Sequence, residues 1–148
     1  MSDLKRIITP FSYSAAVQAG DYVFLGLHRG FGDTFAQQLD GSLAGIADTL
    51  GRLGLDLERL VKVHVWLKHI ADLPEMEKRF ALHFPEGAYP ARMTSTTEFI
   101  DADCLVMVEG VAYRGPVTCP TLEELLAQVD ELNRHSEECS LPLAGEEP

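Results

Sequence analysis

An amphipathic helix is the feature that most constrains how this chain can fold. In residues 34–53 the apolar side chains recur every three or four residues, which is the period of one helix face. They are Phe35, Leu39, Leu43, Ile46, Leu50 and Leu53. Gly54 follows, a suitable residue just past a helix end, and Gly41, Gly45 and Gly51 indicate a close approach of the helix to a sheet. The apolar face requires a second layer to cover it.

That second layer is predicted to be a β-sheet. Residues 60–70 alternate between apolar and polar side chains, with Val61, Val63, Val65 and Leu67 expected on the buried face and Lys62, His64, Trp66 and Lys68 on the other. Residues 4–10 are interpreted as a first strand that ends at Pro10, because proline has no N–H for the ladder. Residues 14–26 are interpreted as two strands joined at Gly20-Asp21, with both faces of the second strand covered.

A second helix and two further strands complete the predicted domain. Residues 72–84 place Met76, Phe80 and Phe84 four apart, with Asp72 as the expected cap and Pro74 in the first turn. Residues 89–99 and 104–113 read as strands. The order β-β-β-α-β-α-β-β predicts an α+β fold, with both helices on one face of a mixed sheet. Aromatic residues on the uncovered face (Tyr22, Phe24 and Trp66) favour an oligomer.

The character of the chain changes after residue 115, so we divide it into a domain at 1–115 and a C-terminal extension at 116–148. Gly115, Pro116 and Pro120 precede a predicted helix at about 121–135, in which Thr121 and Glu124 have capping-box spacing. Its apolar stripe comprises Leu122, Leu125, Leu126, Val129 and Leu132. We expect this helix to dock on the domain or on a neighbouring subunit, and the last dozen residues to form an acidic tail.

Composition limits the possible partners and cofactors. The net charge of −11 disfavours nucleic acid and anionic membranes, both of which require a basic surface. No secretory signal and no membrane-spanning apolar run is present, and the three cysteines lack metal or disulfide spacing, so a cytoplasmic location is expected. The five histidines lack zinc-site spacing, and the glycines at 26, 30 and 32 do not form a dinucleotide fingerprint. We therefore predict neither a metal nor a cofactor.

Several segments resemble a known family when they are taken together. They are "YSAAVQAGDYVFLG", "LGRLGLDLERLVKVHVWLKHIADL", "FPEGAYPARMTSTTEF" and "VMVEGVAY", which follow one another within residues 4–114. In this order and spacing they resemble the Rid family, also called YjgF/YER057c/UK114, of reactive enamine and imine deaminases. The Pro-Ala-Arg triplet at residues 90–92 is the most diagnostic part. The C-terminal extension lies outside the resemblance.

The resemblance implies a chorismate-mutase-like subunit and a homotrimer with ligand sites between subunits. It also implies that Arg92 holds the carboxylate of a small 2-imino or 2-enamino acid, or of the 2-keto acid product. A guanidinium suits this role because its planar fork makes two parallel charge-assisted bonds to a carboxylate. By the same resemblance Tyr13, Gly26 and Thr94 line the ligand site, and Gln38 has a structural role.

Three positions depart from the family pattern, and one of them is Thr94, where the family often has a cysteine two residues after the arginine. Active members carry two glutamates, as Glu-x-Glu, in the last strand, and the first of them positions the attacking water. In this chain the first glutamate is replaced by Met107, and the second is retained as Glu109. A thioether cannot act as a base, and residues two apart on a strand lie about 7 Å from each other, so Glu109 is not a direct replacement. The asparagine usual in the second helix is Glu77, interpreted as a surface charge.

The sequence leaves two functions open. The first is a hydrolase of the 2-iminobutanoate/2-iminopropanoate deaminase type, with Arg92 and Glu109 as candidate catalytic residues. The second is a trimer that binds or senses a small carboxylate without transforming it. In either case Glu109 has an alternative role, in which it pairs with Arg92 or a lysine and supports an interface.

Overall fold

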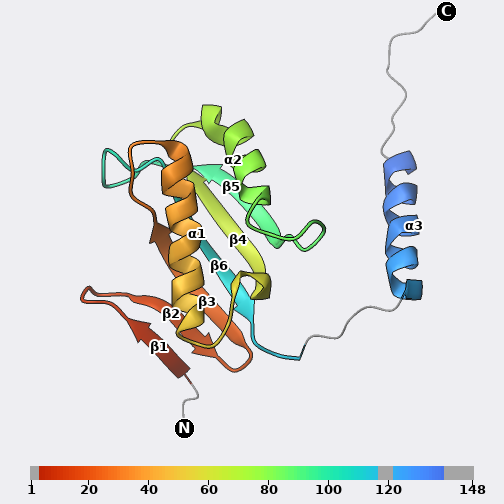
Figure 1. Ribbon diagram of the computed structural model, residues 1–148, viewed down its shortest axis with the longest axis horizontal. Helices are drawn as coiled ribbons and strands as arrows, with labels where there is room; N and C mark the ends of the chain where they lie inside the picture. The colour runs from red at the N-terminus through yellow and green to blue at the C-terminus, as the bar shows by residue number, and fades with distance from the viewer. Residues whose placement is uncertain (1–3, 117–121, 139–148) are drawn as a thin grey trace, which may run out of the picture. The chain divides into compact units, whose positions relative to one another are not determined.

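The computed structural model describes residues 4–116 and 122–138. The chain divides into two compact units, Met1–Gly115 and Pro116–Pro148, which are described separately. In these described residues, the first unit contains a six-stranded sheet and two α-helices, and the second contains one helix (Figure 1).

The sheet is mixed, with the strand order β1-β2-β3-β6-β4-β5. Its strands are β1 (Leu4–Ile8), β2 (Ser14–Ala19), β3 (Tyr22–Arg29), β4 (Leu60–Leu67), β5 (Ala91–Thr96) and β6 (Val106–Tyr113). Only β4 and β5 pair in parallel, and the connection between them contains α2 (Leu73–Ala81), as a parallel pair requires a crossover. The predicted α+β fold and element order are confirmed.

Both helices begin and end close to where the sequence predicts. Helix α1 (Phe35–Gly51) starts with a capping box, in which the Thr34 hydroxyl accepts from the Gln37 N–H and the Gln37 side chain accepts from the Thr34 N–H. Asp72 occupies the cap position of α2, but its side chain makes no capping hydrogen bond. Two short 3₁₀ turns, Leu57–Arg59 and Ile70–Asp72, flank β4.

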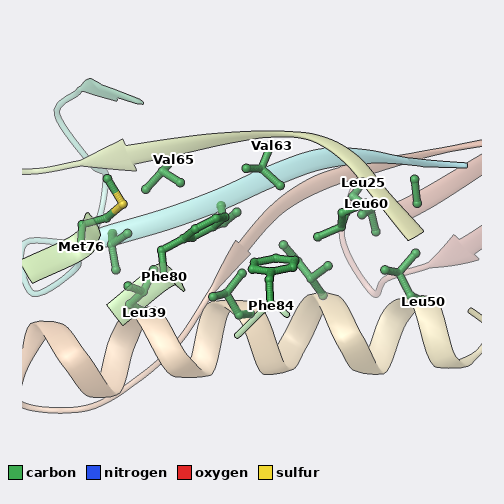
Figure 2. Close-up of a cluster of buried hydrophobic side chains, with 14 of the residues drawn as sticks. Leu25, Leu39, Leu50, Leu60, Val63, Val65, Met76, Phe80 and Phe84 are labelled. Atoms are coloured by element: carbon green, nitrogen blue, oxygen red, sulfur yellow. The ribbon is translucent and has the colours of Figure 1, made fainter. Parts of the chain in front are cut away.

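The core lies between one face of the sheet and the two helices, as Figure 2 shows for Leu39, Phe80 and the facing strand residues. Every residue of the predicted stripe of α1 is buried, as are Met76, Phe80 and Phe84 of the second helical segment. Burial of these side chains accounts for most of the favourable free energy that places both helices on the same face.

The predicted close approach of α1 to the sheet occurs at the end of β3, but it is wrong for Gly51, where a Cβ would meet nothing within 4 Å. A Cβ on Gly41 would lie 2.8 Å from the Gly30 Cα, and a Cβ on Gly30 would lie 2.1 Å from the Gln38 carbonyl oxygen. Both contacts are with backbone atoms and cannot relax by a rotamer change. The two glycines therefore allow the helix to contact the sheet backbone directly.

One prediction within β4 is wrong. Val61 was expected to share the buried face of Val63, yet Val61 is 43% exposed and Leu60 is buried. The register of β4 against β6 shifts between Leu60 and Lys62. This irregularity interrupts the two-residue alternation, so the buried face begins at Leu60 and resumes at Val63.

The other face of the sheet is not covered by any described part of the chain's first unit. Tyr22 and Phe24 on β3 are 49% and 52% exposed, whereas the intervening Val23 is fully buried. The prediction that both faces of this strand are covered is therefore wrong for a single chain. An exposed group of large apolar side chains of this kind is typical of an interaction surface.

The second unit consists of α3 (Leu122–Glu138) in its described part. The apolar stripe from Leu122 to Leu132 is exposed within this unit. Thr121, the predicted capping residue, lies outside the described residues, as does the predicted acidic tail from residue 139 onward. In the described part of the chain, no helix is long and apolar enough to cross a membrane.

Candidate functional site

Arg92 lies near the start of the edge strand β5, on the face of the sheet that carries the helices. It pairs in register with the buried Val63 of β4. Its guanidinium carbon lies 5.0 Å from the centre of the Phe80 ring of α2, and Nη2 donates to the Glu77 carboxylate. The side chain is 24% exposed, and within the described residues Glu77 is bound by Nη2, which leaves Nε, Nη1 and the second N–H of Nη2 unpaired. Arg92 is therefore held in place while part of its donor set stays available.

Glu109 lies on the opposite face of the sheet from Arg92. It is paired in register with His64 and accepts a hydrogen bond of 3.0 Å from the indole Nε1 of Trp66. The Trp66 ring stacks on His64 at 3.9 Å between centres, and His64 in turn is bonded to the Ser95 hydroxyl at 2.9 Å. Within one chain Glu109 therefore pairs with Trp66, and its pairing with Arg92 or a lysine across an interface stays a prediction.

Gly26 lies beside Glu109 through an irregularity in β3. The register of β3 against β6 runs from Leu25↔Gly110 to His28↔Val108, so two residues of β3 oppose the single residue Glu109. A Cβ on Gly26 would lie 3.3 Å from the carbonyl oxygen of Ser14, the first residue of β2. Gly26 thus lies close to the β2 backbone and opposite Glu109, and a Cβ there requires a small shift of the β2 backbone.

Tyr13 directly precedes Ser14, whose carbonyl oxygen lies close to Gly26, and on this ground we assign Tyr13 to the same group on β2, β3 and β6. Its side chain is exposed and stacks on Phe11 at 5.9 Å between ring centres. Thr94 belongs with Arg92 instead, since the two residues are two apart on β5 and Thr94 pairs with Val65. The predicted site residues therefore form two groups on one chain. We call Tyr13, Gly26 and Glu109 the β2–β3–β6 half-site, and Arg92 and Thr94 the β5 half-site.

Met107 lies next to the first half-site and is half-buried. It pairs with Trp66 on one side and with Arg29 on the other. The Arg29 guanidinium is bound by Asp101 and Asp103 and lies 4.5 Å from the centre of the Phe31 ring. Arg29 was not identified from the sequence, because its two carboxylate partners are more than seventy residues away in the chain.

Gln38 connects α1 to the segment that leads into β6. It is almost completely buried, its Nε2 donates to the Gly32 and Asp103 carbonyls, and its Oε1 accepts from the Leu105 N–H. These contacts fix the start of the strand that carries Met107 and Glu109. The structural role expected of Gln38 agrees with this placement.

Asp40 and Cys104 are two further titratable residues, and their surroundings indicate structural roles. Asp40 of α1 receives hydrogen bonds from Arg79 at 3.0 Å and from His83 at 2.9 Å, and the Arg79 bonds hold the pKa of the Asp40 carboxyl below its usual value. Burial of Cys104 raises the pKa of its thiol, which disfavours a nucleophilic thiolate there. Among the described residues, no three His, Cys, Asp or Glu side chains are grouped to hold a metal ion.

The family model described as Endoribonuclease L-PSP matches residues 4–114. The chain belongs to this family. Members are also known as YjgF, RutC and RidA proteins, so the family resemblance read from the sequence is confirmed. The matched range includes all the predicted site residues, and α3 lies outside it.

Individual relatives in the Rid family agree with this assignment. A RutC family protein of Pyrococcus horikoshii is 27% identical over 110 residues, covering 69% of this chain and 86% of the relative. A YjgF family structure from Neisseria meningitidis has a TM-score of 0.74 at 25% identity and covers 78% of this chain and 98% of its own. A yjgF family structure from Streptococcus pyogenes has a TM-score of 0.70 at 28% identity, and the match covers 76% of this chain and 98% of the S. pyogenes chain.

Proposed function

We propose that this Rid-family protein binds a small 2-imino or 2-enamino acid, or the related 2-keto acid, through Arg92. The observation that carries this proposal is the state of the Arg92 guanidinium, which is positioned by Phe80 and Glu77 and retains unpaired N–H groups in the described part of the chain. The second N–H of Nη2, together with the N–H of either Nη1 or Nε, forms the fork that binds a carboxylate through paired charge-assisted bonds. The family model is named for a ribonuclease, but the net charge of −11 favours a small ligand over RNA.

We place the complete site between two copies of the chain. The β5 half-site and the β2–β3–β6 half-site lie on different parts and different faces of the sheet, with β4 between β5 and β6. No single ligand of three or four carbons contacts both groups in one chain. If the β5 edge of one copy abuts β2, β3 and β6 of the next, then Arg92, Thr94, Tyr13, Gly26 and Glu109 line one cleft.

A closed homotrimer is the assembly we propose for this arrangement. Its driving force is burial of the exposed apolar side chains on the uncovered sheet face, among them Tyr22 and Phe24. Light scattering on the full chain tests this directly. A mass of three chains supports the proposal, and a monomer at micromolar concentration contradicts both the assembly and the shared site.

We also propose a cytoplasmic location for the protein, because its cysteines lack disulfide spacing.

In the catalytic form of the proposal, the protein hydrolyses the bound imine. Water adds to the imine carbon, its oxygen becomes the carbonyl oxygen of the keto acid, and the nitrogen leaves as ammonia carrying both water protons. Glu109 is the carboxylate on the β2–β3–β6 half-site that can orient this water. Its hydrogen bond from Trp66 leaves the second carboxylate oxygen available for that task.

A non-catalytic binding protein is the second candidate. The observation that favours it is Met107, which pairs in register with Arg29 and Trp66 and occupies the position that the family resemblance assigns to the water-positioning glutamate. A thioether neither accepts a proton nor orients water at neutral pH. In this form Arg92 holds a small carboxylate that leaves unchanged.

One experiment separates these candidates. The rate of keto-acid release from enzymatically generated 2-aminoacrylate is compared for wild type, Arg92→Ala, Met107→Glu and the control Arg52→Ala, which removes an exposed arginine at the end of α1. Acceleration by wild type and Arg52→Ala but not by Arg92→Ala supports the deaminase. Acceleration by Met107→Glu alone supports the binding protein. If no variant accelerates release and keto acids do not bind wild type, the proposed function is wrong.

A further inference from the structure

Arg92 already has a carboxylate beside it, and this pairing sets the charge of the β5 half-site. Glu77 lies on α2, three residues before Phe80, and contacts the Arg92 Nη2. The half-site thus presents a cation and an anion side by side, instead of a lone cation. A lone guanidinium attracts any small carboxylate, whereas a guanidinium next to a carboxylate discriminates among them by their second charge.

The contact with Glu77 contributes little to the stability of the fold. Glu77 is 59% exposed, and ion pairs in such positions contribute little to stability because water screens both charges. Arg92 remains packed against Phe80 in any case. Glu77 is therefore available to interact with a ligand as well as with Arg92.

We propose that Glu77 makes the Arg92 site selective for zwitterionic 2-amino and 2-imino acids over the corresponding 2-keto acid anions. This inference rests on the proposed function and assigns its ligand class. A carboxylate bound to the free N–H groups of Arg92 lies near the Glu77 carboxylate, and the two negative charges repel each other. An ammonium or protonated imine on the adjacent carbon removes that repulsion and adds a charge-assisted hydrogen bond to Glu77.

A consequence for turnover follows from the same charges. Hydrolysis converts a zwitterionic imino acid into a keto acid that bears only the negative charge. The site therefore holds the substrate more tightly than the product, and release of the keto acid is favoured. In the non-catalytic form of the proposal, the same arrangement makes the site a receptor for amino acids.

The test compares two ligands of the same size with opposite predictions. Alanine and pyruvate each have three carbons and one carboxylate, and only alanine carries a second, positive charge. Dissociation constants are measured by NMR titration of the full-length protein for wild type, Glu77→Gln, Arg92→Ala and Glu75→Gln. Glu75 is the matched control, because it lies in the first turn of the same helix and its removal changes the net charge equally.

We expect Glu77→Gln to bind alanine about threefold more weakly and pyruvate about threefold more tightly, a change of roughly tenfold in their ratio. Glu75→Gln is expected to leave the ratio unchanged, and Arg92→Ala to lose both ligands. Equal ratios in Glu77→Gln and Glu75→Gln, with pyruvate binding still dependent on Arg92, overturn this inference and leave the proposed function intact. Binding of neither ligand to wild type, or binding that Arg92→Ala does not affect, overturns both.

Discussion

Gln38 is the residue whose replacement tests most directly how the fold supports the site. Its side chain is 1% exposed and makes three hydrogen bonds to backbone atoms, of 3.1 Å to the Gly32 oxygen, 2.9 Å to the Asp103 oxygen and 2.8 Å from the Leu105 nitrogen. The change Gln38→Met preserves the length and approximate volume of the side chain and removes all three bonds. It therefore separates hydrogen bonding from packing.

The expected loss follows from the number of bonds. Each contributes a net of about 1 kcal/mol, and a backbone group left buried without a partner costs more than that, so the loss of unfolding free energy is about 3–5 kcal/mol. This is a large part of the roughly 5–15 kcal/mol that stabilises a typical domain. The segment from Asp103 to Leu105 is released as well, so the start of β6 loses its attachment to α1.

Urea denaturation at a fixed protein concentration, followed by far-UV circular dichroism, measures this loss. The control is Gln18→Met on β2, where the side chain is not fully buried and has a single long contact with Arg114. We expect the control to change stability by less than about 0.5 kcal/mol. A loss below 1 kcal/mol for Gln38→Met, or one equal to that of the control, refutes the reasoning.

Three further predictions concern α1, β3 and the C-terminal unit. Burial lowers the pKa of His28, whose ring bonds to the Gly26 oxygen and the Thr49 hydroxyl. The folded chain therefore binds fewer protons than the unfolded chain, and it loses stability as the pH falls below about 6.5. Melting temperatures of wild type and His28→Gln at pH 7.5 and 5.5 check this, and an equal effect of pH on both proteins contradicts it. Gly41→Ala is expected to lower the free energy of unfolding by about 1–3 kcal/mol, because its Cβ meets the Gly30 backbone. Gly51→Ala, where a Cβ meets nothing, is expected to raise that free energy by up to about 1 kcal/mol. The reverse order of stability in urea denaturation contradicts the close approach of α1 to the sheet. A chain that ends at Gly115 is expected to unfold cooperatively at nearly the wild-type temperature, and loss of its thermal transition contradicts an independent first unit.

Secondary structure was predictable wherever the pattern is local. The stripe of α1 and the four-residue spacing of Met76, Phe80 and Phe84 identify helices because one face of a helix collects residues three and four apart. Val61 shows the limit of this reasoning, since the register shift in β4 arises from its pairing with β6. The exposure of Tyr22 and Phe24 depends in the same way on which sheet face the helices cover.

The candidate site was predictable as a set of residues but not as an arrangement. Arg92 was selected by the Pro-Ala-Arg triplet and the segments around it, and all of them lie within the matched range. Its contacts with Glu77 and Phe80 depend on how α2 packs beside β5, and the sequence alone indicates Glu77 only as a surface charge. The contact of Glu109 with Trp66 depends on the register of β6 against β4, which the sequence does not specify.

The amino-acid sequence by itself determined the order of helices and strands, the family and the residue types available for chemistry, because these depend on short-range periodicity and on motif spacing. The tertiary structure alone decided that Arg92 and Glu109 face opposite sides of the sheet, and that the predicted site residues form two half-sites. The physical reason is that the two-residue alternation of a strand assigns its side chains to faces only after its register with the neighbouring strands is set. That register depends on pairings between residues far apart in the chain.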